Sequence, residues 1–455
     1  MTAFISINPF TEKHIHQFHL IGDEHLDEVV SKATESQKIW RLLSFDKRAS
    51  YFIKLATLIK EHQNELAELA VFEMGKPIKE ALAEVLKCTT ACEYYASKSE
   101  QILTPNSSVA DTGKTVEILY EPIGVVLSIF PWNFPYWQII RSAVPILMAG
   151  NTALIKPAPN VPKCSLAIQN LFQQAGFPEG VMQTIFADEH QIAGLIADDR
   201  IKAVTLTGSE KAGSIVASQA AKHIKRAVLE LRGSDPFIVL EDADLVVAAD
   251  TAITARFQNN GQSCIASKRF ILQANIADQF IELLKERMAH LNLGDPMDTN
   301  VNIGPMARND LRDKLKDQVD ESIKLGAQII YQHPQEMGKG FFFPPTILTH
   351  IPKNAPAYSE ELFGPVLSVF IVEHATEAIH LANDTSFGLG ACVWTNNKEL
   401  GNDIAKELVC GTVFINGLVK SNTAYPFGGA KHSGFGRELG EWGIREFCNV
   451  KTIWI

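Results

Sequence analysis

Cysteine is scarce in this sequence and carries no pairing pattern. Seven cysteines occur among 455 residues, an odd number, with no Cys-x-x-Cys pair and no disulfide-type spacing. Such usage excludes a disulfide-stapled scaffold and is typical of reduced thiols. We therefore expect a cytoplasmic protein.

Long apolar runs and an excess of basic residues are also missing. The most apolar region, residues 123–155, is interrupted by Pro131, Pro135 and Arg141, so it lacks the roughly 18 uninterrupted apolar residues of a membrane span. No basic segment followed by an apolar core marks a secretory signal at the N-terminus. The formal charge of −10 argues against a nucleic-acid or acidic-membrane partner, so we expect a small-molecule substrate.

Two blocks of alternating strand and helix patterns follow a helical N-terminal region at residues 24–100. The first block begins near residue 124, and the second runs from about residue 236 to residue 425. This order predicts two α/β domains with parallel sheets, whose ligands bind at the carboxyl ends of the strands. The expected strands of the first block are 125–130, 153–157, 182–186, 203–209 and 227–231.

Three side chains near these strand and helix ends have chemical potential. Asn133, between the prolines of PWNFP, is placed to present its amide to an oxyanion. Cys264 follows the polar turn FQNNGQS, where amide donors stabilise a thiolate, whereas the other six thiols are expected to be structural. Glu230 lies at the end of an expected strand, as a base in an apolar pocket or as half of an ion pair with Arg232.

The loop TGSEKAG after the fourth strand has the composition of a phosphate-binding turn. Small residues at the start of a helix let backbone amides and the helix dipole approach an anion, although a plain strand-to-helix turn is the alternative. Lys156 ends another strand, where it either binds adenosine ribose hydroxyls or a 2′-phosphate, or is simply solvated. The candidates in the loop are Thr207, Gly208, Ser209 and Gly213.

A metal site is not indicated. His14 and His16 alternate on one face of an expected strand, which is a possible start for a ligand set. They have no carboxylate or cysteine in a matching pattern, so we expect no metal.

Eight short motifs stand in a fixed order along the chain. They are EMGKP (73–77), PWNFP (131–135), KP (156–157), TGS (207–209), LEL (229–231), GQSC (261–264), EELFGPV (360–366) and PFGGAKHSGFGRELG (426–440). In order and spacing they resemble the aldehyde dehydrogenase superfamily almost from end to end. Glu230 precedes Cys264 by 34 residues and Glu361 follows it by 97, as in that family.

The resemblance implies a fold and a domain division. The fold is α/β, with a Rossmann-type cofactor domain and a catalytic domain, each on a parallel sheet, and a small β element for oligomerisation. Strand-like segments at 115–120 and 451–455 lie outside both blocks, and through them the resemblance implies a homodimer or homotetramer. The implied parts are 1–103 and 123–232 for NAD(P) binding, 233–425 for catalysis, and 104–122 and 426–455 for oligomerisation.

The resemblance also implies a mechanism. Cys264 is the nucleophile, Asn133 and the Cys264 backbone amide form the oxyanion hole, and Glu230 activates the water that hydrolyses a thioester. NAD or NADP accepts a hydride. The implied cofactor contacts are Trp132, Lys156, Ser209, Glu361 and Phe363.

The substrate prediction depends on Arg141. In the semialdehyde-oxidising branch that the chain resembles, an arginine eight residues after the oxyanion-hole asparagine binds a distal carboxylate, and Ser421 is a second expected contact. We therefore expect oxidation of succinate semialdehyde. Two alternatives stay open: a broad-specificity aliphatic or aromatic aldehyde dehydrogenase, and a catalytically impaired homologue that acts as a binding protein.

Three positions depart from the family pattern. Pro159 replaces a glutamate that binds the adenosine ribose, so both NAD and NADP remain possible cofactors. Gln258 stands where some semialdehyde enzymes carry a second arginine. Arg232 replaces a glycine, and because residues two apart on a strand share a face, it is expected to lower the pKa of Glu230 or to crowd the cofactor.

Overall fold

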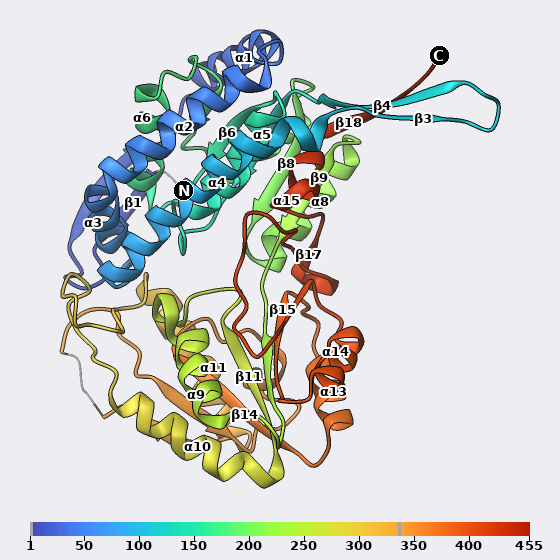
Figure 1. Cartoon of the computed structure of the whole chain (residues 1–455). Coiled ribbons are helices and arrows are strands. Elements are labelled where there is room, and N and C mark those ends of the chain that lie inside the picture. The colour runs from blue at the N-terminus through green and yellow to red at the C-terminus, as the bar shows by residue number, and fades with distance from the viewer. Residues whose placement is uncertain (1–2, 335–337) are drawn as a thin grey trace.

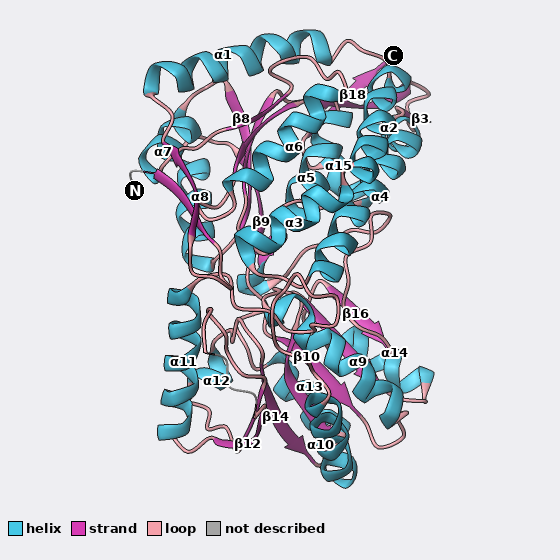
Figure 2. Cartoon of the chain, turned by 90° about the vertical axis from the view of Figure 1, so that its left-hand side faces the viewer, coloured by secondary structure: helices cyan, strands magenta, loops and turns pink. Residues whose placement is uncertain are grey.

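A computed structural model of the chain describes residues 3–334 and 338–455. Within these residues the strands form one sheet of six, one of seven, one of three and one of two. The six-stranded sheet lies in the upper part of the molecule and the seven-stranded sheet in the lower part (Figures 1 and 2). The prediction of two α/β sheets is confirmed.

The six-stranded sheet has the order β17-β9-β8-β5-β6-β7, in which every neighbouring pair from β9 to β7 is parallel. All five strands expected in the first block are present. Part of the C-terminal segment also joins this sheet, because β17 pairs antiparallel with β9. The strands are β5 (Val125–Ile129), β6 (Thr152–Lys156), β7 (Met182–Thr184), β8 (Ile201–Thr207), β9 (Arg226–Glu230) and β17 (Gly434–Phe435).

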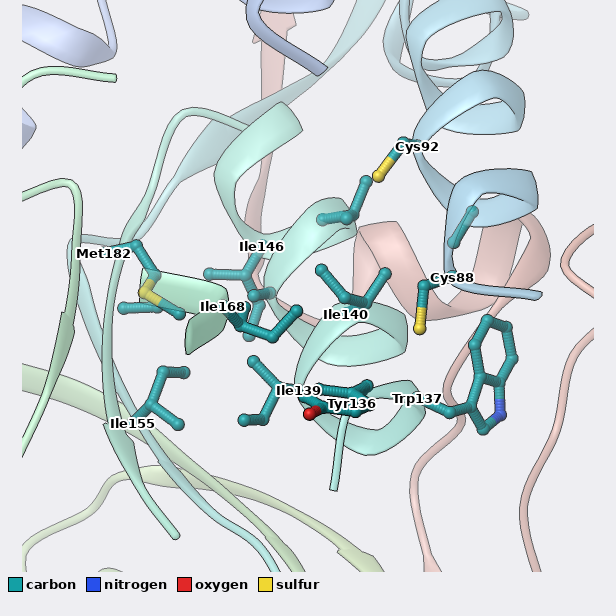
Figure 3. Close-up of a cluster of buried hydrophobic side chains, with 14 of the residues drawn as sticks. Cys88, Cys92, Tyr136, Trp137, Ile139, Ile140, Ile146, Ile155, Ile168 and Met182 are labelled. Atoms are coloured by element: carbon teal, nitrogen blue, oxygen red, sulfur yellow. The ribbon is translucent and has the colours of Figure 1, made fainter. Parts of the chain in front are cut away.

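Eight helices surround this sheet; the apolar faces of α2 to α6 contribute to the largest core of the molecule, and those of α1, α7 and α8 to a second core. On α4, Cys88 and Cys92 recur at a spacing of four residues and face α5, where Ile140 lies beside Cys88 (Figure 3). The helices are α1 (Asp23–Trp40), α2 (Phe45–Glu61), α3 (Gln63–Met74), α4 (Ile78–Leu103), α5 (Trp137–Met148), α6 (Pro162–Gln174), α7 (Glu189–Ala197) and α8 (Glu210–Lys222).

The seven-stranded sheet has the order β12-β13-β14-β11-β10-β15-β16, and only its edge strand β12 is antiparallel to its neighbour. Its strands are β10 (Asp235–Val239), β11 (Ser267–Gln273), β12 (Gln328–Gln332), β13 (Thr346–Thr349), β14 (Val366–Val372), β15 (Gly390–Trp394) and β16 (Thr412–Ile415). Its helices are α9 (Leu245–Phe257), the 3-10 turn η1 (Gln258–Gly261), α10 (Ala274–Ala289), α11 (Asn309–Lys324), α12 (Pro356–Ser359), α13 (Ala375–Asn383) and α14 (Lys398–Glu407).

Two small antiparallel sheets complete the fold. The hairpin of β3 (Asn106–Val109) and β4 (Thr115–Pro122) projects from the body, with β18 (Cys448–Trp454) along it (Figure 1). The segments 115–120 and 451–455 were thus correctly predicted as strands, and they pair with each other. The remaining elements are β1 (Ala3–Ile7), β2 (His14–His19), η2 (Lys431–Ser433) and α15 (Gly440–Arg445).

The described residues contain neither a membrane-spanning helix nor a cluster of metal ligands. None of their helices is long and apolar enough to cross a membrane. No group of three or more histidine, cysteine, aspartate or glutamate side chains among them is arranged to hold a metal ion.

Candidate active site

Two cavities meet at Cys264. The first, called the strand-end cavity, has a volume of about 330 Å³, and the second, called the α4 cavity, has a volume of about 140 Å³. Cys264 and Gln138 line both of them. The strand-end cavity is lined chiefly by residues 131–133, 207–209, 231–232, 361 and 363 and by one face of α11. The α4 cavity is lined chiefly by α4, α5 and residues 263–265 and 419–421.

The turn that carries Cys264 has an uncommon backbone. Asn259 and Asn260 have φ angles of 59° and 57°, and Gly261 follows with φ 71°. Left-handed conformations are strained for residues other than glycine and persist only where the surroundings hold them. The buried Asn260 side chain does so by donating to the carbonyl oxygens of Gly75 and Pro305, both at 2.9 Å. The position of the thiol is therefore set by tertiary contacts.

Asn133 is oriented from both ends of its side-chain amide. Its Nδ2 donates to the carbonyl oxygen of Gln262 at 3.1 Å, and its Oδ1 accepts from Gln138 Nε2 at 2.9 Å. An amide nitrogen carries two hydrogens, so one remains to donate to a ligand. Asn133 also lines the strand-end cavity beside Cys264. The predicted nucleophile and the predicted oxyanion donor thus face the same space.

A buried ion pair supports the turn that holds Asn133. Lys76 pairs with Glu84, and both side chains are almost fully buried. Glu84 Oε1 accepts from the backbone amides of Tyr136 and Trp137 at 2.9 and 3.0 Å. Sequence reasoning did not find this role, although Lys76 lies in the quoted motif EMGKP.

The surroundings of the Cys264 thiol favour its protonated form. Burial raises its pKa to about 11, while the positive charges of Arg141 and Lys268 act in the opposite direction. Lys268 Nζ donates to the carbonyl oxygens of Ser263 and Cys264, both at 2.7 Å, and lies 3.2 Å from Glu361 Oε1. Lys268 was missed in the sequence, where only its position four residues after Cys264 could have indicated it.

Arg232 does not act on Glu230, so that expectation was wrong. Its Nε lies 3.5 Å from Glu361 Oε2, in the strand-end cavity. Strand β9 ends at Glu230, and the next amide, of Leu231, donates to the carbonyl oxygen of Ser433. Because the strand stops there, the rule that residues two apart share a face does not extend to Arg232. Its alternative role, crowding the cofactor space, agrees with its place in the cavity wall.

Glu230 is buried at the end of β9 and is not among the described residues that line either cavity. Its Oε1 lies close to Gly428, because a Cβ added to Gly428 would stand 2.6 Å from it. Burial raises the pKa of Glu230 well above its ordinary value, and Glu438 adds to the rise. Arg141 and Arg437 oppose it. The predicted base is thus set back from the thiol.

The predicted phosphate loop lies at the wall of the strand-end cavity. Thr207, Gly208 and Ser209 line it, and Ser209 also caps α8 by accepting from the amide of Ala212 at 3.3 Å. Gly213 faces away into the helix-to-strand contact, where an added Cβ would meet Leu231 at 2.7 Å.

Of the other predicted cofactor contacts, three line the strand-end cavity and one, Lys156, lies apart from it. Trp132, Glu361 and Phe363 line the strand-end cavity, and the rings of Trp132 and Phe363 meet edge to face at 5.8 Å. Lys156, at the end of β6, is not among the residues around this cavity. Its Nζ lies 5.4 Å from the centroid of the Phe4 ring, and burial lowers its pKa.

The predicted substrate contacts line the α4 cavity, together with Gln258. Arg141 is buried, and its Nε lies 2.6 Å from Glu438 Oε2 while its Nη2 donates to Thr207 Oγ1 at 3.3 Å. Ser421 is buried as well. Arg141 therefore reaches this cavity as part of an ion pair, a partnership that the sequence did not reveal.

Comparison with known proteins accounts for this arrangement. The profile of the Aldehyde dehydrogenase family matches residues 2–453. The chain belongs to the aldehyde dehydrogenase family. The resemblance drawn from the eight motifs is confirmed.

Individual relatives agree in sequence and in fold. This aldehyde dehydrogenase is 47% identical over its full length to the full-length "Probable succinate-semialdehyde dehydrogenase" (NADP+) of Synechocystis sp.. It is 42% identical to a succinate semialdehyde dehydrogenase (NAD(P)+) of Escherichia coli, over 100% of this chain and 98% of that protein. A succinic semialdehyde dehydrogenase of Streptococcus pyogenes, solved with NADP+, superposes with a TM-score of 0.97 at 35% identity, over 100% of both chains.

Proposed function

We propose that the protein oxidises succinate semialdehyde to succinate with NAD or NADP as hydride acceptor. The observation that carries this is the position of Cys264 between two cavities of different character, one beside the Asn133 amide and one beside cationic side chains. The names of the relatives above support the same substrate and cofactors.

The hydrogen-bonding groups in the wall of the strand-end cavity suit a nicotinamide dinucleotide. The hydroxyls of Thr207 and Ser209 and the N-terminal amides of α8 suit a pyrophosphate, and the Glu361 carboxylate suits ribose hydroxyls. When bound, NAD(P)+ supplies the acceptor for a hydride. Pro159 leaves no carboxylate at its position to repel a 2′-phosphate, which supports use of both cofactors.

Oxidation begins on Cys264. The thiol gives up its proton to water, and the sulfur attacks the aldehyde carbon to form a thiohemiacetal. The oxyanion then accepts hydrogen bonds from the free hydrogen of Asn133 Nδ2 and from the Cys264 backbone amide. Loss of a hydride from the thiohemiacetal carbon leaves a thioester on Cys264.

Glu230 acts as the general base in hydrolysis of the thioester. Its carboxylate takes a proton from water, and the resulting hydroxide attacks the thioester carbon and releases the acid from Cys264. Burial makes Glu230 a stronger base than an ordinary carboxylate. To act, the carboxyl group turns from its place beside Gly428 toward the thiol.

The domain division and assembly belong to the same proposal. The exposed apolar side chains Val450, Trp454 and Ile455 on and beside β18 support a homodimer or homotetramer built through the three-stranded sheet. A cytoplasmic location, expected from the unpaired cysteines, is part of the same proposal. The proposed parts are 1–103 and 123–232 for the cofactor, 233–425 for catalysis, and 104–122 and 426–455 for oligomerisation.

Steady-state turnover tests this function. The absorbance of the reduced cofactor is followed with succinate semialdehyde and with butanal, an uncharged aldehyde of equal chain length. We expect kcat/KM to favour succinate semialdehyde, and Cys264→Ser to abolish both reactions. Equal kcat/KM values would support the broad-specificity alternative, and no turnover with any aldehyde would support a binding protein.

A further inference from the structure

The α4 cavity has an outer neighbour, and two side chains line both. The outer cavity has a volume of about 300 Å³ and is lined by α4 and by residues 421–424. Lys87 and Ser421 belong to both linings. Lys87 lies on the same face of α4 as Glu80 and Glu84, at seven and three residues' distance. Lys87 and Ser421 therefore lie between the outer cavity and Cys264.

Ser421 accepts two hydrogen bonds and keeps a donor. Lys87 Nζ donates to Ser421 Oγ at 2.7 Å, and Trp137 Nε1 donates to the same oxygen at 3.1 Å. With both lone pairs of the hydroxyl engaged, its hydrogen is directed at an acceptor elsewhere. Trp137 lies beside Cys88, the residue after Lys87, and its ring centroid is 4.4 Å from Lys87 Nζ (Figure 3). The lysine is thus held over the ring with its charge directed at the cavity.

Lys87 has no anionic partner within the part of the chain that the structure describes, where no carboxylate oxygen lies within 4.0 Å of its Nζ. Of the other cations near this cavity, Lys420 is exposed, whereas the buried ones are paired. Arg141 is paired with Glu438 at 2.6 Å, and Lys76 is paired with Glu84. A largely buried cation without an anion is costly, so an arriving carboxylate gains more at Lys87 than at a charge already neutralised.

We propose that Lys87 binds the distal carboxylate of the substrate beside the contact already expected from Ser421, and that Lys87 is the chief determinant of selectivity for carboxylated aldehydes. The remaining ammonium hydrogens of Lys87 and the hydroxyl hydrogen of Ser421 donate to the carboxylate oxygens. Arg141 lines the same cavity, but its charge is already paired with Glu438. Gln258, in the same wall, is neutral. This inference rests on the proposed function and names the residues that recognise the carboxylate of its substrate.

The variant Lys87→Met tests this with two aldehydes of equal length, because methionine keeps an unbranched apolar stem. For succinate semialdehyde we expect kcat/KM to fall by about 10- to 100-fold, mostly through KM, as for the loss of a charged hydrogen bond in a binding site. For butanal we expect a change of less than about twofold. Lys87→Arg restores most of the loss because it returns a cationic donor.

Lys420→Met is the matched control. Lys420 lines the same cavity but is exposed, so this change removes equal charge without a buried contact. We expect less than about a threefold effect on either aldehyde, since exposed charges are screened. An equal loss in Lys420→Met and Lys87→Met would overturn the proposal, as would a loss in Lys87→Met that is the same for both aldehydes.

Isothermal titration calorimetry with succinate measures the affinity of the wild type and of Lys87→Met for a carboxylate without turnover. Weaker binding to the variant supports the carboxylate site, and equal affinity overturns it. If the enzyme binds succinate through Lys87 but does not oxidise the semialdehyde, the proposed function is contradicted while the carboxylate site stands. The melting temperature of each variant shows whether it is folded.

Discussion

Arg141 Nε and Glu438 Oε2 lie 2.6 Å apart, with both side chains buried. This ion pair joins α5 to the C-terminal segment beneath the α4 cavity. Glu438 also raises the pKa of Glu230, after burial the largest cause of that shift. One contact thus connects the wall of the substrate cavity to the proposed base.

Replacing Glu438 by glutamine should weaken the fold and shift the base. Because Arg141 would be left as a buried charge without an anion, we expect the free energy of unfolding to fall by about 3 kcal/mol. Loss of the nearby negative charge lowers the pKa of Glu230, so the acidic limb of the pH profile for thioester hydrolysis moves to lower pH. Chemical denaturation and the pH dependence of kcat measure the two effects.

The pair of half-buried Arg445 and exposed Glu441 is the control for that variant, because it lies on the same segment, with the two side chains 3.4 Å apart. Glu441→Gln should change stability by less than about 1 kcal/mol. A stability loss in Glu438→Gln no larger than this would contradict a structural role for the buried pair.

Replacing Asn133 by alanine should remove the side-chain donor of the oxyanion hole. We expect kcat to fall by about 100- to 1000-fold, with little change in the affinity for the cofactor. Gln138→Ala, which only frees the orientation of Asn133, should cost about tenfold. Rapid-mixing measurement of the first turnover tests both, and an undiminished first turnover in Asn133→Ala would exclude this amide from the chemistry.

Replacing Arg232 by glycine should leave activity unchanged or raise it. Arg232 is about one-third exposed and lies 3.5 Å from Glu361, which keeps its pairing with Lys268 at 3.2 Å. Little is therefore lost, and the space beside the cofactor opens. The measurement is kcat/KM for NAD and for NADP. A loss of tenfold or more would show that Arg232 has been recruited to the site.

Selectivity for the carboxylated substrate should disappear at alkaline pH. Burial and, to a smaller extent, the charge of Arg141 lower the pKa of Lys87 to about 8, against the opposing effects of Cys88 and Glu84. Lys420, also facing it, acts in the same direction as Arg141. An ammonium is charged below its pKa, so the selectivity is complete below about pH 7 and is lost as the pH rises through about 8.

The ratio of kcat/KM for succinate semialdehyde to that for butanal measures this, because titration of the thiol affects both aldehydes alike and cancels. In Lys87→Met the ratio should be low and independent of pH. A ratio that falls with the same midpoint in that variant would assign the titration to another group.

The sequence alone determined most of the strands and helices and indicated the candidate reacting groups. Alternation of strand and helix patterns predicts parallel sheets, and a polar turn after a helix or a proline-bounded asparagine is a local signal. Cys264 and Asn133 could be selected in this way, since their chemistry depends on neighbours in the chain. The strands 115–120 and 451–455 were found for the same reason.

Only the tertiary structure decided which charges meet. Lys87 and Ser421 are separated by 334 residues, and no periodicity relates them. Arg232 illustrates the limit, because its position two residues after Glu230 predicted a shared face, whereas the end of β9 turned it toward Glu361. A pattern in the chain specifies the face that a residue occupies. The partner on that face comes from a distant segment, and it decides whether a buried cation is already neutralised or free to bind a substrate.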